Sequence, residues 1–176
     1  MYQSYSVYVG NAGKAEPFTP TVTSAYKILA DKKYLHICTD DEKALRAPET
    51  TAFIRCTAGK GKIYLHNHTI ILNENEYVFV KFYDIFKYNS LSNIWGYRWV
   101  NFLSENGSEF ELNKIYSSKN SETEEACFDR FLSISNITEN TNYMNALFLN
   151  YFYTVCEANK IDIQKIKSDQ GNRLID

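Results

Sequence analysis

A mostly β domain followed by two α-helices is predicted by a change of hydrophobic periodicity along the 176 residues. Between residues 21 and 117, short segments alternate apolar and polar side chains, with turns roughly every 8–12 residues, as in β-barrels and sandwiches. Over residues 118–160, apolar residues instead recur at steps of three and four, which is the period of a helix. Before the barrel, Pro17 and Pro20 interrupt residues 1–20 and predict an N-terminal arm.

The strands of the predicted barrel follow from period-2 alternation between turn-forming residues. Gly59-Lys60-Gly61 is predicted to form a tight turn, and Asn67-His68 a two-residue hairpin turn. The predicted strands are Tyr34–Thr39, Phe53–Thr57, Lys62–His66, Thr69–Leu72, Glu76–Phe82, Phe86–Asn89, Tyr97–Phe102 and Glu109–Tyr116.

Two helices are predicted after the barrel. The first begins at Ser121 or Glu122, where acidic residues favour the helix N-terminus, and the second opens with the motif Thr138-x-x-Thr141. One stripe of the second helix is apolar and is predicted either to pair two copies of the chain or to pack on its own domain. The stripe residues are Met144, Leu147, Tyr151 and Val155. Residues 161–176 are mostly polar and are predicted to be a linker.

Charge and cysteine content limit the classes of function. Nineteen Lys and Arg against 21 Asp and Glu give a net charge of −2, which excludes nucleic-acid binding by bulk positive charge. No apolar run reaches the roughly 18 residues of a membrane helix, and no secretory signal is visible. The four cysteines are scattered without a Cys-x-x-Cys pair, so we expect free thiols in a reducing cytoplasm.

His66-Asn67-His68 is the triplet that most suggests a metal site. Residues i and i+2 of a strand point to one face, so the two imidazoles could share a metal with Glu74. A hairpin turn would instead hold both histidines in solvent, and this interpretation is preferred. With no Ser-His-Asp or Cys-His arrangement in view, we expect neither catalysis nor a metal or other cofactor.

Fourteen tyrosines, 11 phenylalanines and two tryptophans make the chain rich in aromatic rings. The most informative group lies in one predicted strand, where Trp95, Tyr97 and Trp99 share one face. Large rings with polar tips suit a carbohydrate, whose C–H face stacks on an indole while its hydroxyls find polar partners. The alternative is that these rings only fill the barrel core.

Several motifs of the barrel resemble the N-terminal cupin domain of AraC-family transcriptional regulators, over about residues 46–102. The motifs are Phe53-x-x-x-x-x-Gly59-x-Gly61, Ile63 and Leu65, Leu72, Tyr77–Val80, Tyr88, and Trp95-x-Tyr97-x-Trp99-Val100-x-Phe102.

The resemblance implies a cupin-like β-barrel, a double-stranded β-helix or jelly roll, that binds a small-molecule effector, often a sugar. It places Tyr88, Tyr97 and Trp99 at sugar contacts, with Trp99 as the stacking platform, and Arg46 near a sugar-binding arginine. The helices would pair two protomers into a homodimer. An N-terminal arm in these relatives can cover the pocket, which would give Tyr5, Tyr8 or Phe18 the role of a lid.

The family's helix-turn-helix DNA-binding motifs have no counterpart in the chain, so DNA would be bound only through a domain beyond residue 176. The leading hypothesis is an effector-sensing and dimerisation domain. One alternative is a metal-dependent cupin enzyme, such as a sugar isomerase or dioxygenase, using His66, His68 and Glu74. Another is a sensor whose pocket is filled by its own side chains.

Overall fold

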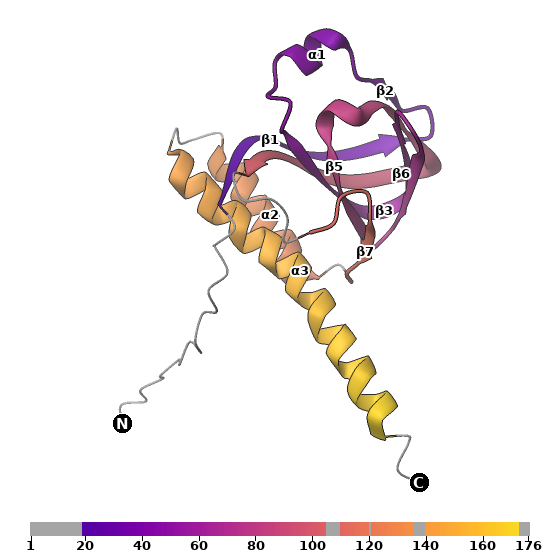
Figure 1. Cartoon of the computed structure of the whole chain (residues 1–176), viewed down its shortest axis with the longest axis vertical. Helices are drawn as coiled ribbons and strands as arrows, with labels where there is room; N and C mark the ends of the chain where they lie inside the picture. The colour runs from indigo at the N-terminus through magenta and orange to yellow at the C-terminus, as the bar shows by residue number, and fades with distance from the viewer. Residues whose placement is uncertain (1–18, 105–109, 120, 136–139, 173–176) are drawn as a thin grey trace.

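The computed structural model describes residues 19–104, 110–119, 121–135 and 140–172 (Figure 1). The predicted arm therefore lies outside the described residues, apart from Thr19 and Pro20, and Pro20 already begins a strand. The elements are β1 (Pro20–Asp31), β2 (Leu35–Ile37), α1 (Asp40–Ala44), β3 (Thr51–Leu65), β4 (Thr69–Asn73), β5 (Glu76–Lys81), the 3-10 turn η1 (Phe82–Asp84), β6 (Ile85–Ser104), β7 (Ile115–Ser117), α2 (Glu122–Ser135) and α3 (Thr141–Asn172).

The strands form one antiparallel sheet in the order β1-β6-β3-β5-β7, with β2 paired to β6 and β4 paired to β3. Figure 1 shows the sheet wrapped around itself, with α2 and α3 along one side and the end of α3 projecting beyond the sheet. The predicted mostly β class with two following helices is confirmed. None of the described helices is both long enough and apolar enough to cross a membrane.

The turn predicted at Gly59-Lys60-Gly61 is wrong, because β3 runs through it without a break. Gly59 adopts a left-handed φ of +67°, and the register with β6 shifts on both sides of it, so the glycine forms a bulge that bends the strand. A Cβ at Gly59 would collide with the carbonyl oxygen of Ile94, and one at Gly61 with the Trp95 indole. Close contact between β3 and β6 therefore requires glycine here.

Other strand predictions hold in part. The hairpin between β3 and β4 is confirmed, with the Leu65 N–H donating to the His68 carbonyl at 2.9 Å. The predicted strands Phe86–Asn89 and Tyr97–Phe102 are parts of the single long strand β6. Of Glu109–Tyr116, only the end falls in a strand, β7. β1 was not among the predicted strands, because this strand at the end of the sheet is mostly exposed and lacks clear alternation.

Two separate apolar clusters result from this arrangement. The barrel core lies inside the curved sheet and includes Ile54, Ile63, Leu72, Val78, Trp95, Tyr97 and Trp99. The helix-side core lies between the sheet and the two helices and includes Phe53, Phe79, Phe102, Phe128, Phe131, Phe148 and Phe152. Strand β6 contributes to both, because its successive side chains point to opposite faces.

Three residues of the predicted dimerisation stripe are buried inside the chain's own helix-side core. Leu147 is 8% exposed, whereas Tyr151 and Val155 are fully buried. Met144 is half-buried against the same cluster. These side chains pack on their own domain, so a partner could contact α3 only through its other face. The helix itself extends to Asn172, through most of the predicted linker at 161–176.

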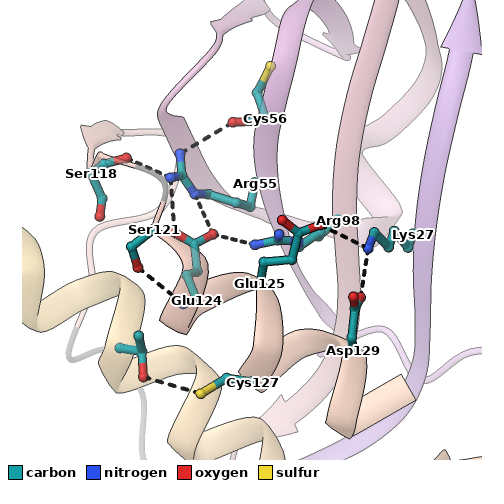
Figure 2. A network of polar contacts seen from close by, with 11 residues as sticks. Lys27, Arg55, Cys56, Arg98, Ser118, Ser121, Glu124, Glu125, Cys127 and Asp129 are labelled. Carbon is teal, nitrogen blue, oxygen red and sulfur yellow. Dashed lines mark hydrogen bonds and ion pairs between the residues drawn. The ribbon is translucent and has the colours of Figure 1, made fainter. Parts of the chain in front are cut away.

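A buried ion network attaches α2 to the sheet (Figure 2). Glu124, in the first turn of α2, accepts a two-point contact from Arg55 of β3 at 3.0 and 3.1 Å, and a third bond from Arg98 of β6 at 2.6 Å. The side chains of all three residues are at most 2% exposed. The Arg55 guanidinium also donates to the Ser118 carbonyl at 2.6 Å. One carboxylate thus joins two strands and a helix.

Candidate functional site

A cavity of about 250 Å³ opens at one end of the barrel, between β1, β2, α1 and β6. The four side chains predicted to bind a ligand, Arg46, Tyr88, Tyr97 and Trp99, all line it. The remaining lining residues are Tyr26, Ile28, Tyr34, His36, Glu42, Phe82 and Asn101. The structure therefore brings together residues that are up to 53 positions apart, from Arg46 to Trp99.

Alternation along β6 explains why Tyr97, Trp99 and Asn101 point into the cavity together. Trp95 belongs to the same face but is absent from the cavity lining, because its indole is fully buried against Gly61. Tyr88 comes from the first half of the same long strand. Strand β6 thus supplies three of the six Phe, Tyr and Trp rings of the lining, and these three, Tyr88, Tyr97 and Trp99, form the aromatic wall of the cavity.

The aromatic wall is held by its own contacts. The Trp99 ring lies 4.9 Å from the Tyr88 ring, and its indole N–H donates to the Asn101 side-chain oxygen at 2.7 Å. The Asn101 amide donates in turn to the Ser24 hydroxyl at 2.8 Å. The indole is therefore fixed in position before any ligand arrives, and its N–H is already satisfied.

Arg46 supplies the cationic group of the lining. Its guanidinium lies 4.5 Å from the centre of the Phe82 ring and donates to Ser24 at 2.9 Å and to the Tyr26 hydroxyl at 3.4 Å. Burial alone would raise the pKa of Tyr26, but the bonds with Ser24 and Arg46 lower it. The buried Nε of Arg46 has no hydrogen-bond partner among the described residues.

Two tyrosine hydroxyls meet at the cavity wall. Tyr34 and Tyr97 are joined by a 3.0 Å hydrogen bond. Burial and the bond to Tyr34 raise the pKa of Tyr97, while burial and the neighbouring Tyr34 raise that of Tyr88. Both phenols are neutral at physiological pH and can donate as well as accept hydrogen bonds.

A second polar group lies on the same wall. His36, Cys38 and Glu42 place one nitrogen, sulfur or oxygen atom each within 4.8 Å of one another. Burial, and then the Glu42 carboxylate, raise the pKa of the Cys38 thiol to about 11. Sequence analysis did not predict this cluster, because Glu42 reaches it only through the chain reversal between β2 and α1.

The structure does not bring together the three metal ligands that the sequence suggested, His66, His68 and Glu74. His66 and His68 are exposed in the β3–β4 hairpin, and Glu74 is exposed beyond the far end of β4. Among the described residues, only the His36, Cys38 and Glu42 group is compact enough to hold a metal ion. The route to a metal-dependent enzyme through His66, His68 and Glu74 is therefore wrong.

The chain was compared with known families and structures. No protein-family model and no curated protein matches the sequence. Among solved structures, YhaK from Escherichia coli aligns at a TM-score of 0.46 with 9% identity, over 69% of this chain and 51% of that one. Apo ToxT from Vibrio cholerae aligns at a TM-score of 0.42 with 12% identity, over 77% of this chain and 56% of that one. A cupin protein from Bacteroides fragilis aligns at a TM-score of 0.31 with 14% identity, over 62% of this chain and 90% of that one. The chain thus spans about half the length of YhaK and ToxT.

Proposed function

We propose that the chain is the effector-sensing domain of an AraC-type transcriptional regulator, which binds a small molecule in the barrel cavity. The observation that carries the proposal is the convergence of Arg46, Tyr88, Tyr97 and Trp99 on one open cavity. An open cavity among the described residues favours a functional pocket over one filled by the protein's own side chains. Its volume of about 250 Å³ lies just below the ~300–1,000 Å³ typical of ligand pockets, so the effector is small.

The effector is proposed to be a carbohydrate. The cavity lining combines aromatic rings with neutral hydroxyl groups, and the Trp99 indole lies beside the phenols of Tyr88 and Tyr97. An indole stacks on the C–H face of a sugar, whereas the phenols and the Arg46 guanidinium of the lining can hydrogen-bond to its hydroxyls. The same guanidinium could pair with a carboxylate, and the experiment below separates the two classes.

Effector binding is proposed to act on the helices through β6. Arg98 lies between Tyr97 and Trp99 in sequence but points to the other face of the strand, where it donates to Glu124 of α2. A shift of β6 on ligand binding would therefore displace the first turn of α2 directly, through the bond between Arg98 and Glu124. The regulator would transmit this change to a DNA-binding domain beyond residue 176 and to a second protomer.

The ligand class is tested by a thermal-shift screen of mono- and disaccharides beside small carboxylates, with affinities then measured by calorimetry. A sugar should raise the melting temperature, and Trp99→Ala should lower its affinity at least about fivefold, if a stacked sugar contributes as much as a stacked base, on the order of 1–3 kcal/mol. Tyr64→Ala serves as a control, because that ring lies outside the cavity lining, beside Lys62 and Lys87. A response to carboxylates alone would exclude the carbohydrate, and full binding by Trp99→Ala would exclude the site.

Homodimerisation is a separate part of the proposal. With Leu147, Tyr151 and Val155 buried, the face of α3 open to a partner carries Tyr143, Ala146, Asn150 and Tyr153, which are all exposed. Sedimentation velocity at micromolar concentration should show a dimer, and Ala146→Glu should shift it toward monomer. Ser133→Glu, on the exposed surface of α2, is the matched control. A monomeric wild type would contradict this part alone.

A further inference from the structure

We propose that His36, Cys38 and Glu42 form a binding site for a divalent transition metal, with Zn²⁺ as the best match, on the wall of the cavity. The three side chains offer an imidazole nitrogen, a thiol sulfur and a carboxylate oxygen within 4.8 Å of one another. Nitrogen, sulfur and oxygen donors of these types are the ligands that Zn²⁺ takes in proteins. The inference concerns the metal alone and does not rest on the proposed function.

Local structure explains how the three ligands meet. His36 and Cys38 are two residues apart on β2 and its extension, so their side chains point to the same side of the strand. The chain then reverses at Thr39, whose side chain and backbone form a capping box with Glu42 at the start of α1. That capping box brings the Glu42 carboxylate back over the strand, with its Oε2 3.3 Å from His36 Nε2.

The spacing is close to that of a formed site. Tetrahedral Zn²⁺ with bonds of about 2.0–2.3 Å separates its ligand atoms by roughly 3.3–3.8 Å. The 3.3 Å between His36 and Glu42 already falls in this range, and the 4.8 Å limit of the cluster requires a closure of about 1 Å.

Neighbouring groups hold the ligands in place. The Glu42 carboxylate accepts from the Thr39 N–H at 3.0 Å, and the His36 ring stacks on Tyr88 at 4.8 Å. The Cys38 N–H donates to the Phe86 carbonyl at 2.9 Å, which fixes the backbone of the thiol ligand. Supporting contacts of this kind orient metal ligands in natural sites.

Charge and position point to a site with one open coordination position. On binding, the Cys38 thiol releases its proton to solvent, and the thiolate and the carboxylate together balance the two positive charges of the metal. His36 and Glu42 line the cavity, whereas Cys38 is 8% exposed and lies behind them. The fourth position therefore faces the cavity, where water or a donor atom of a cavity ligand can complete the shell.

The test is titration of the reduced, tag-free chain with Co²⁺, which replaces Zn²⁺ and shows a thiolate-to-metal charge-transfer band. One equivalent should produce the band, and Zn²⁺ should displace it. Cys38→Ser should abolish the band, whereas His36→Gln and Glu42→Gln should keep it at an affinity reduced at least about tenfold, as expected when part of a metal site is removed. The last two side chains are partly exposed, so their replacement leaves the core intact.

Cys127→Ser and His66→Gln are the matched controls, because they remove the same donor types from residues outside the cluster. Both should bind Co²⁺ as the wild type does. Absence of the band in the wild-type protein, or its survival in Cys38→Ser, would overturn the site. No organic ligand is present in the titration, so its failure is distinguishable from failure of the effector proposal, which the sugar screen tests in metal-free buffer.

Discussion

The two faces of β6 show how one strand can serve two different cores. Towards the helices, it contributes Val100 and Phe102 to a cluster that is filled mainly by phenylalanine. Towards the barrel interior, it contributes Trp95, Tyr97 and Trp99, beside which the cavity opens. Phenylalanine rings predominate in the helix-side cluster, where Tyr77 and Tyr151 are also buried, whereas most of the aromatic rings that line the cavity are tyrosine or tryptophan. The abundance of aromatic residues thus has two separate causes.

The two sides also handle charge differently. On the helix side, Arg55, Arg98 and Glu124 are buried but bonded to one another. On the cavity side, the Arg46 Nε is buried without a hydrogen-bond partner among the described residues. A charge bonded to its counter-charge stabilises a fixed arrangement. The difference between the two sides is the counter-charge: Arg55 and Arg98 share the Glu124 carboxylate, although the Arg98 Nε is itself unpaired among the described residues, whereas the Arg46 guanidinium donates to the hydroxyls of Ser24 and Tyr26.

The largest effect is expected from Glu124→Ala. Removal of the carboxylate leaves two buried guanidinium groups without their counter-charge, so the free energy of unfolding should fall by about 3–5 kcal/mol. Chemical denaturation followed by circular dichroism measures the loss. Glu125→Ala is the control, because its pair with Lys27 is exposed and contributes about 0–1 kcal/mol. Equal losses for the two variants would show that the buried network does not attach α2.

The two faces of β6 can be compared directly by replacing one ring on each face, Phe102 and Trp99. Phe102→Ala should lower the free energy of unfolding by about 3–5 kcal/mol, since it opens a void in a closely packed region. Trp99→Ala should cost less, because it enlarges a cavity that already exists, yet it should be the variant that loses the effector. Chemical denaturation of both variants measures the loss of stability, and calorimetry measures the loss of effector binding. The reverse order of stabilities would mean that the cavity side is the structural core.

Sequence predicted the parts of the molecule that depend on local periodicity. The shared face of Trp95, Tyr97 and Trp99 follows from period 2, and α2 begins at Glu122 as its acidic first turn indicated. The bulge at Gly59 escaped prediction, because a glycine pair between two apolar segments is equally consistent with a turn. Assembly of the cavity lining and of the His36 cluster depends on chain reversals and strand pairings that no local pattern encodes.

Tyr34→Phe should have a moderate effect on stability. The substitution removes the 3.0 Å hydrogen bond to Tyr97 while keeping the ring, so the expected loss is about 0.5–1.5 kcal/mol. Because the Tyr97 hydroxyl then loses its bond to Tyr34 and keeps only Tyr88 beside it, affinity for a sugar should change while affinity for Co²⁺ should not. Calorimetry with each ligand measures both quantities. A change in Co²⁺ affinity would show that the tyrosine pair and the His36 cluster behave as one unit.

The smallest effect is expected from pH, and it concerns the barrel core. Burial raises the pKa of both Cys38 and Cys56 from 9.0 to about 11, so each folded thiol keeps its proton where the unfolded one loses it. The stabilisation is therefore complete below pH 9 and declines as the pH rises from about 9 to about 11. Denaturation curves between pH 8.5 and 9.5, below the range of the tyrosines, should show the first part of this decline. The Cys38→Ala/Cys56→Ala double variant should flatten it, and Cys127→Ala should not. A decline that persists in the double variant would place the titrating groups outside the barrel core.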